Sequence, residues 1–452
     1  MNLIILGAGK VGETLIENLV KENHDITVVD IDASTVQSVI NRYDVQGIIG
    51  GGVERSVLVE AGVDSADFFI ACTSRDEMNI LACVLARKLG AKRTIARVRD
   101  PEYFKEMANM REDLGLDYAF NPELTTAIEI SQVLKFPSAR NVEKFASGKA
   151  RMVEFDILAG NPIANKSLKE ISKEFGNNFL VGIVNRGENV YIPHGDFVIK
   201  EGDVVSIIAS ETEIIHFCKK IKIFKPRAKS VFIVGGGKIA YYLAQELSES
   251  GVSVKIMEKD EERAEELSAL LSSATVILGD GTEQNLLEEE SFKRMDACVT
   301  LTGMDEENVI ISLFAKQSGV DKIITKVDRT SILNMVKQLG LDTVVSPRNV
   351  IANHIVRFVR AYQNVNVGDD GIDTLYRIGE QAEVVEFTTG ENFVGKDKPL
   401  KDLSIKDNVL IGGIVRNGEF ILPSGDSKIK VGDKVIVVTA EQQITELSKI
   451  LK

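Results

Sequence analysis

Several features that mark particular protein classes are missing from this chain of 452 residues. Tryptophan is absent, and the four cysteines show no Cys-x-x-Cys spacing, so neither a zinc site nor a disulfide framework is indicated. Only nine residues are proline, while 44% of the residues are hydrophobic and 27% are charged. This composition is typical of a globular protein and excludes a fibre or a disordered tail.

Long hydrophobic runs and an excess of basic residues are lacking as well. No segment approaches the ~20 consecutive apolar residues of a membrane-spanning helix, and no basic region precedes the apolar start at residues 3–6. The 67 acidic residues outnumber the 54 basic ones by 13, and this negative charge repels phosphate backbones and anionic headgroups. We therefore expect a cytoplasmic protein without a signal peptide, a membrane span or nucleic acid as a partner.

The chain repeats itself. The sequence GAGKVG that starts at Gly7 returns as GGGKIA at Gly235, a shift of 228 positions (235 − 7). Thr73 then corresponds to Thr302 at a shift of 229 (302 − 73). A register that changes by one position over this distance indicates an internal duplication.

Each half has two parts. The first part alternates short apolar strands, such as residues 25–29 and 67–71, with amphipathic helices, such as residues 77–89. This alternation predicts parallel βαβ units in a doubly wound, Rossmann-like sheet, whereas the turn-rich second part predicts a small α+β subdomain. The predicted segments are a first Rossmann-like domain at 1–135, a small subdomain at 140–220, a basic linker at 221–229, a second Rossmann-like domain at 230–362 and a second small subdomain at 370–452.

The linker lies in a lysine-rich stretch, residues 219–229. One interpretation is a contact for acidic lipid headgroups or for an acidic partner surface. The other is a solvated connector, which the short length of the stretch favours.

A glycine motif in the first half has the context of a dinucleotide-binding turn. Gly7, Gly9 and Gly12 follow a predicted strand and open a predicted helix, as the Gly-x-Gly-x-x-Gly fingerprint requires. Asp30 ends the next strand, where a carboxylate accepts hydrogen bonds from ribose hydroxyls and repels a 2′-phosphate. The pattern favours NAD(H), or another adenine nucleotide, over NADP(H).

The second half carries the same pattern with two changes. Ala240 replaces the third glycine and Glu258 replaces Asp30, and both changes are compatible with a nucleotide site. Neither Gly-x-Ser-x-Gly nor His-Glu-x-x-His occurs, and none of the four histidines recurs in the duplicate half. We therefore expect binding of the nucleotide without its chemical conversion.

The order of these motifs resembles the regulatory domains of potassium channels and transporters called RCK or KTN domains. Besides the glycine turn and the acidic strand end, the segments ACTSRDEMN, IARVR and NPE carry the resemblance. It covers nearly the whole chain, and the small modules resemble the carboxyl-terminal subdomains of that family. Two such units in tandem are similar to the peripheral regulatory subunits of Trk potassium uptake systems.

The resemblance implies which residues hold the nucleotide. It places the pyrophosphate on the glycine turn, the adenosine ribose on the acidic strand end, and the remaining ligands at the ends of the fourth and fifth strands. The residues concerned are Gly7, Ala8, Gly9, Lys10, Val11, Gly12, Asp30, Thr73, Ser74 and Arg97 in the first half, and Gly235, Gly236, Gly237, Lys238, Ile239, Glu258, Asp280, Thr302 and Lys326 in the second half.

The halves depart from each other at two motifs of the family. A Gly-Asp-Gly-Thr stretch that the family places near the adenine stands intact around Asp280, whereas residues 50–53 lack the carboxylate and the hydroxyl. Glu123 matches a carboxylate that in related proteins binds a cation near the nucleotide phosphates, and Arg348 occupies the corresponding place. We expect the two halves to differ in ligand or in response.

The function that the resemblance implies is regulation of a membrane-embedded Trk-type potassium transporter subunit from the cytoplasmic face of the membrane. The nucleotide, NAD(H) or competing ATP or ADP, would gate the pore through a ring of RCK units. The duplication suggests a homotetramer, with the apolar helices at 77–89 and 307–315 as assembly surfaces or as parts of the core. The alternatives are an NAD-dependent dehydrogenase and a soluble nucleotide sensor without a membrane partner.

Overall fold

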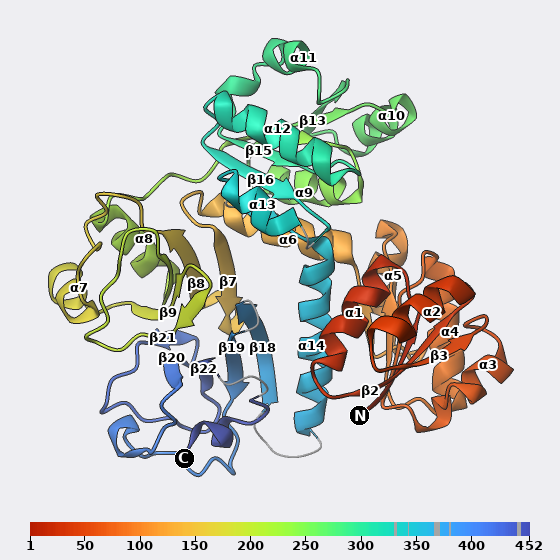
Figure 1. Cartoon of the computed structure of the whole chain (residues 1–452), viewed down its shortest axis with the longest axis horizontal. Helices are drawn as coiled ribbons and strands as arrows, with labels where there is room; N and C mark the ends of the chain where they lie inside the picture. Colours follow the sequence, from red (N-terminus) through yellow and green to blue (C-terminus); the bar gives the residue numbers. More distant parts are fainter. Residues whose placement is uncertain (330–331, 342, 366–370, 379–380, 441–443) are drawn as a thin grey trace.

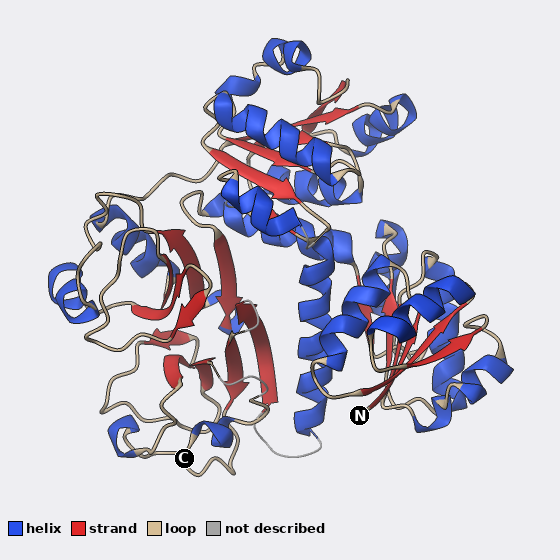
Figure 2. Ribbon diagram, in the orientation of Figure 1, coloured by secondary structure: helices blue, strands red, loops and turns tan. Residues whose placement is uncertain are grey.

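The chain folds into two parallel sheets flanked by helices and two antiparallel sheets (Figures 1 and 2). This computed structural model describes the whole chain except residues 330–331, 342, 366–370, 379–380 and 441–443. The predicted boundary at residue 370 lies outside the described residues. In the described part of the chain, no helix is both long enough and apolar enough to cross a bilayer.

The first half begins with a parallel sheet and its helices. Its elements are β1 (Asn2–Leu6), α1 (Lys10–Val20), β2 (Asp25–Asp30), α2 (Ala33–Arg42), β3 (Gln46–Ile49), α3 (Arg55–Glu60), β4 (Phe68–Ala71), α4 (Asp76–Leu89), β5 (Thr94–Arg97), α5 (Pro101–Met110), β6 (Tyr118–Phe120) and α6 (Pro122–Lys135). The strand order is β3-β2-β1-β4-β5-β6. The chain reverses its direction of winding between β1 and β4, and doubly wound sheets bind ligands in the crevice at such a point.

The second half repeats this arrangement. Its elements are β12 (Ser230–Val234), α9 (Lys238–Glu249), β13 (Ser253–Glu258), α10 (Glu261–Leu270), β14 (Ala274–Leu278), α11 (Gln284–Glu289), β15 (Ala297–Thr300), α12 (Asp305–Gln317), β16 (Lys322–Lys326), α13 (Leu333–Gln338), β17 (Val344–Val345) and α14 (Pro347–Val365). The order β14-β13-β12-β15-β16-β17 is that of the first sheet. The predicted class, two Rossmann-like parallel sheets that each precede a small module, is confirmed.

Each small module is an antiparallel sheet. The first contains β7 (Asn141–Phe145), β8 (Ala150–Asp156), α7 (Leu168–Phe175), β9 (Leu180–Arg186), β10 (Asn189–Tyr191), β11 (Val204–Ala209) and α8 (Glu211–Lys220), and the second contains β18 (Gly371–Ile378), β19 (Ala382–Thr388), β20 (Val409–Arg416), β21 (Glu419–Ile421) and β22 (Lys434–Thr439). Ile183 and Ile208 of the first sheet share an apolar cluster with Val384 and Val438 of the second. The two modules therefore pack against each other through their sheets.

The two halves exchange helices. After the first sheet, α6 crosses to pack against α9, and after the second sheet, α14 crosses to pack against α1 (Figure 1). Ile130 and Leu134 of α6 lie in one apolar cluster with Leu243 of the second half. Ile351 of α14 lies in the cluster that contains Leu15 of the first half. Each parallel sheet thus completes its core with a helix of the other half.

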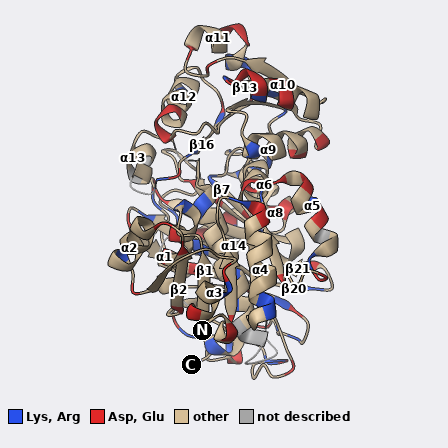
Figure 3. Cartoon of the chain, turned by 90° about the vertical axis from the view of Figure 1, so that its right-hand side faces the viewer, with Lys and Arg blue, Asp and Glu red and all other residues tan. Residues whose placement is uncertain are grey.

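Acidic side chains gather on outer helices of the second half (Figure 3). The sequence of α10 holds four glutamates and that of α11 two. An anionic ligand is repelled by this surface, so any anion site in the molecule depends on donors and cations close to the ligand.

A buried network of ion pairs joins the first half, α14 and the second small module. Arg360 of α14 is 1% exposed and contacts Glu22, which follows α1, and Glu383 of β19, with Nε–Oε2 and Nη1–Oε2 distances of 2.5 and 2.8 Å. Arg377 of β18 contacts the same two glutamates. Buried charges require compensation, and each carboxylate here faces two guanidinium groups.

The corresponding position of α6 carries no such network. Lys135 stands where α14 has Arg360, at the shift of 225 that relates Pro122 to Pro347 (347 − 122). It pairs with Glu246 at 3.4 Å, and each side chain is 35% exposed.

We expect Arg360→Met to lower the free energy of unfolding by about 3–5 kcal/mol, because two buried carboxylates then lose a partner. Lys135→Met, the matched control, should cost less than about 1 kcal/mol, because its partner stays in contact with water. Urea unfolding followed by circular dichroism measures both values. Equal losses in the two variants would contradict the importance assigned to the network.

Candidate functional site

One cavity of about 1110 Å³ is lined by the glycine turns of both halves. It lies at the carboxyl ends of β1 and β4 and of β12 and β15, because Gly7 and Thr73 and their counterparts Gly235 and Thr302 all line it. The exchanged helices therefore bring two equivalent sites to a common space.

The first glycine turn has the geometry that its sequence predicts. Gly7 has φ +96°, and a Cβ atom at this position would lie 2.9 Å from the backbone nitrogen of Thr73. A Cβ atom on Gly12 would lie 1.9 Å from the Gly7 carbonyl oxygen, so the third glycine permits α1 to approach β1. Gly9 has open space in front of it and precedes α1, so a ligand is able to approach the backbone there.

Acidic side chains hold both glycine turns. The Ala8 N–H donates to Asp30 Oδ2 at 2.7 Å and the Asp32 N–H donates to Asp30 Oδ1 at 3.0 Å. Glu258 accepts from the Gly236 and Asp260 N–H groups at 2.5 and 2.9 Å in the same manner. Two carboxylate oxygens offer about four acceptor positions, so each side chain retains capacity for ribose hydroxyls.

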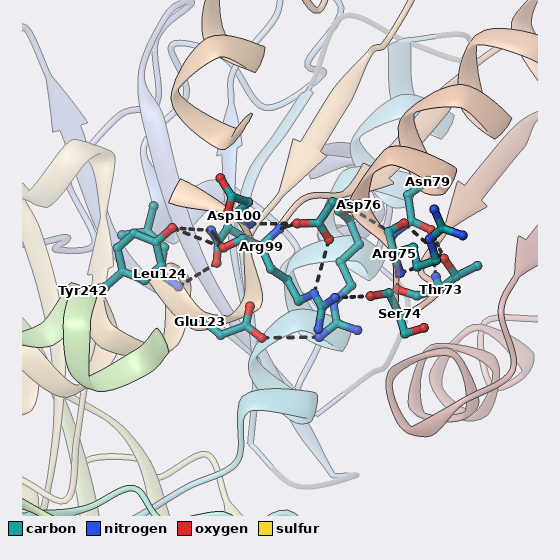
Figure 4. Close-up of polar contacts among 12 residues, drawn as sticks. Thr73, Ser74, Arg75, Asp76, Asn79, Arg99, Asp100, Glu123, Leu124 and Tyr242 are labelled. Atoms are coloured by element: carbon teal, nitrogen blue, oxygen red, sulfur yellow. Dashed lines mark hydrogen bonds and ion pairs between the residues drawn. The ribbon is translucent and has the colours of Figure 1, made fainter. Parts of the chain in front are cut away.

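A buried asparagine, the last residue of the segment ACTSRDEMN, joins the ends of β4 and β5, and Figure 4 shows it beside Thr73. Asn79 of α4 is 0% exposed, accepts from the Thr73 N–H at 2.9 Å and donates to the Arg97 carbonyl oxygen at 3.0 Å. Asn308 does the same for Thr302 and Lys326 at 2.8 and 3.1 Å. The two asparagines lie 229 positions apart (308 − 79), the same shift that relates Thr73 to Thr302, so comparing the two halves of the sequence is enough to pick them out.

An ion pair lies beyond the first glycine turn. Arg97 Nη2 is 3.4 Å from Glu123 Oε1, and Glu123 belongs to the first turn of α6. Burial lowers the pKa of Arg97, and the Glu123 carboxylate counteracts this effect. Arg97 Nε and Glu123 Oε2 are buried and have no hydrogen-bond partner among the described residues of the protein.

In the second half, other side chains occupy the positions that correspond to Arg97 and Glu123. Lys326 Nζ donates to the Thr302 carbonyl oxygen at 3.0 Å and lies 3.4 Å from Asp328 Oδ2. Asp280 accepts from the N–H and the hydroxyl of Thr282 at 2.9 and 2.7 Å, and these hydrogen bonds lower the pKa of its carboxyl group. Arg348 lines the cavity where the first half has Glu123.

The cavity brings together most of the residues predicted for the site. Ala8 and Gly12 are the two that do not line it, because Ala8 contributes its N–H to Asp30 and Gly12 is buried where α1 approaches the Gly7 carbonyl group. Glu123 lines it as well, but in the described part of the chain no three potential metal ligands come together. A cation at Glu123 stays a prediction.

The titratable side chains that line this cavity are mainly carboxylates, lysines and arginines. Within the described residues, no histidine and only one cysteine line it. The cysteine is Cys72, and burial raises its pKa to about 12, so it is a thiol at neutral pH. The site is suited to binding by hydrogen bonds and charge.

The residues present fit an adenine nucleotide. The turn offers backbone N–H groups without a Cβ barrier at Gly9, the strand end offers a carboxylate, and buried atoms of Arg97 and Glu123 lack partners within the described protein. Such a set matches the pyrophosphate and the hydroxyl groups of a nucleotide.

Models of two domain families match the chain in tandem. The TrkA-N domain matches residues 3–122 and 231–347, and the TrkA-C domain matches residues 152–222 and 383–452. The chain belongs to the TrkA family. The predicted membership is thereby confirmed.

Curated TrkA proteins match over the full length. The Trk system potassium uptake protein TrkA homolog of Archaeoglobus fulgidus is 33% identical over 452 residues, 100% of both chains. The Trk system potassium uptake protein TrkA of Haemophilus influenzae is 30% identical over 461 residues, 100% of this chain and 99% of that protein.

Solved structures share the fold. The GsuK channel bound to NAD matches with a TM-score of 0.63 and 18% identity over 99% of this chain and 78% of that chain. The GsuK RCK domain matches with a TM-score of 0.63 and 17% identity over 98% of this chain and 92% of that chain. This TrkA family member therefore has the fold of tandem RCK domains.

We expect Asn79→Leu to lower the free energy of unfolding by about 1–3 kcal/mol, because the Thr73 N–H and the Arg97 carbonyl oxygen lose their buried partner. Hydrogen exchange should be faster at the ends of β4 and β5 and unchanged at β15 and β16. Asn308→Leu should show the reverse pattern. A change at exposed Asn41 to leucine is the control and should alter stability by less than about 0.5 kcal/mol.

Proposed function

We propose that the protein is a nucleotide-binding regulatory subunit that gates a membrane-embedded potassium transporter of the Trk type from the cytoplasmic face of the membrane. The observation that carries this proposal is the pair of glycine turns with acidic strand ends, Asp30 and Glu258, that open into one cavity between the halves. The full-length match to Trk system potassium uptake proteins names the transporter class.

The ligand in this proposal is NAD(H), with ADP or ATP competing for the same sites. The structural neighbours support these two classes, because one GsuK structure is bound to NAD and another to ADP. In this proposal the nucleotide regulates without being converted, since no histidine lines the cavity among the described residues and burial keeps the Cys72 side chain as a thiol. A dehydrogenase would need an acid–base group beside the nicotinamide.

Gating requires that the nucleotide binds one arrangement of the subunit more tightly than another. A coupling free energy of about 1–3 kcal/mol changes the population of an open state by a factor of 5 to 150, roughly. In the first half, α1 starts at the glycine turn and ends near Glu22, which contacts Arg360 of α14 and, through it, Glu383 of the second module. A displacement of α1 at the nucleotide would therefore be passed through α14 to the second small module.

Assembly into a homotetrameric ring is part of the proposal. The helices α4 and α12 bury one face in their own half, yet Leu81 and Ile310 are 53% and 58% exposed at corresponding positions. These side chains would contact neighbouring chains, as the resemblance to RCK rings implies.

We expect Asp30→Ala to abolish nucleotide binding in the first half, because the ribose hydroxyls and the turn at Ala8 lose their acceptor. Isothermal titration should show one binding event per chain in place of two. Asp44→Ala, an exposed site in the same half, should leave both events unchanged. Asp30→Asn keeps the size of the side chain and removes its charge. If its melting temperature equals that of the wild type, a loss of binding in this variant reflects the lost ligand contact and not a lost fold. Unaltered binding in both Asp30 variants would refute the assignment.

We also expect nucleotide-dependent binding to the membrane subunit of a Trk-type transporter in detergent. Size-exclusion chromatography with and without NADH or ADP should show a change in the co-eluting fraction, and Asp30→Ala should reduce that change. Co-elution that fails under all nucleotide conditions would favour a sensor without a membrane partner. Steady oxidation of NADH with a metabolite would favour a dehydrogenase.

A further inference from the structure

The two nucleotide cradles carry opposite charges at one equivalent position. We define a cradle as the glycine turn and strand ends of one half. After the sixth strand of each sheet, a helix starts with proline, and the next residue is Glu123 in α6 and Arg348 in α14. Both side chains line the shared cavity. The backbone frames are duplicates, so a difference in ligand preference between the cradles must arise from substitutions such as this one.

The first cradle has an unused acceptor and an unused donor. Glu123 Oε2 and Arg97 Nε are buried without a partner in the described protein, although the two side chains form an ion pair through other atoms. Buried polar atoms without partners cost free energy, so a suitable ligand supplies both. A ribose hydroxyl donates and accepts, whereas an ionised phosphate only accepts and is repelled by a carboxylate.

The second cradle offers a cation at the place of Glu123. Arg348 has no carboxylate partner among the described residues, whereas Lys326, the counterpart of Arg97, lies 3.4 Å from Asp328 Oδ2. A guanidinium group binds phosphate with two parallel hydrogen bonds, and Arg348 also lies in the first turn of a 19-residue helix, where the helix dipole favours anions.

The residue before the proline supports this reading. In the first half, Asn121 caps α6 by accepting from the Leu124 N–H at 2.9 Å. In the second half, Ser346 is 9% exposed and its hydroxyl has no partner in the described protein. A buried hydroxyl without a partner therefore lies two residues before Arg348, just outside the cavity lining.

We propose that the second cradle selects a nucleoside diphosphate or triphosphate, whose terminal phosphate binds Arg348, and that the first cradle selects the dinucleotide NAD(H), whose second ribose binds Glu123. This assignment rests on the proposed function, in which both glycine turns hold nucleotides. It makes residues 123 and 348 the determinants of ligand class in the two halves.

The test requires proteins with a single open cradle. Gly9 and Gly237 have φ −67° and −65°, and a Cβ atom would meet nothing within 4 Å at either position. An aspartate fits there without strain and places a negative charge at the helix terminus that a pyrophosphate needs. Gly9→Asp therefore leaves the second cradle open, and Gly237→Asp leaves the first.

Isothermal titration of these full-length proteins with ADP and with NADH measures the selectivity. In Gly9→Asp, ADP should bind more tightly than NADH. Adding Arg348→Glu should weaken the affinity for ADP about 10- to 100-fold, because a charge-assisted hydrogen bond is lost, and should change the affinity for NADH less than about threefold. In Gly237→Asp, NADH should bind more tightly, and adding Glu123→Arg should strengthen ADP. Arg227→Glu, in the exposed linker, is the matched charge control and should change neither affinity.

The outcomes separate this inference from the proposed function. Unchanged ADP affinity after Arg348→Glu would overturn the selectivity while leaving nucleotide regulation intact. Tight ADP binding to Gly237→Asp would overturn it as well. Binding that requires magnesium would indicate a cation between Glu123 and the phosphates, and binding without magnesium would show that Glu123 does not exclude a terminal phosphate. Absence of binding of either ligand to the wild-type protein would overturn both proposals.

Discussion

The exchange of α6 and α14 is the constraint on which the rest of the structure depends. Each helix presents apolar side chains, such as Ile130 and Ile351, to the sheet of the other half, and burying one such side chain stabilises the fold by about 1.5–3 kcal/mol. Neither sheet can keep its core if the partner half departs. The same crossing sets Glu123 and Arg348 at the cavity, because both stand at the starts of the exchanged helices. The core packing and the geometry of the site are therefore consequences of one arrangement.

The two halves share one backbone fold, and the polar residues at equivalent positions differ. The turn and its carboxylate are nearly unchanged, since Asp30 and Glu258 make the same two hydrogen bonds. The ends of the exchanged helices differ most, with a buried network at Arg360 and an exposed pair at Lys135. The buried charges thus join the first half, α14 and the second small module, whereas the pair at Lys135 joins α6 to α9 on the surface. Unequal connections of this kind allow two similar sites to have unequal effects.

Much of the fold could be predicted from the sequence, because strands buried on both faces appear as short apolar runs between amphipathic helices. The predicted strand at residues 25–29 and the predicted helix at residues 77–89, which ends before Gly90 with φ +120°, agree with the structure. The short strands β6 and β17 were not predicted, since three and two residues carry no periodicity. The helix exchange was not predicted either, because an apolar helix face does not specify which sheet covers it. For the site, glycine turns and strand-end carboxylates have fixed spacing, whereas Asn79 acts through a contact that only the folded helix creates.

A comparison of free energies indicates which contacts of the molecule a bound nucleotide is able to break. A nucleotide at one hundred times its Kd stabilises the arrangement it prefers by about 2.7 kcal/mol. Separating Arg360 from its two buried glutamates would cost about 3–5 kcal/mol, more than the nucleotide supplies. A rearrangement must therefore keep α1, α14 and the second module together as one body and deform weaker contacts. The linker is such a place, since Lys225 and Asp321 form a pair with side chains 47% and 73% exposed. Exposed pairs contribute less than about 1 kcal/mol, so nucleotide binding supplies enough free energy to break this linker contact, whereas the buried packing of α6 against α9 has to be kept.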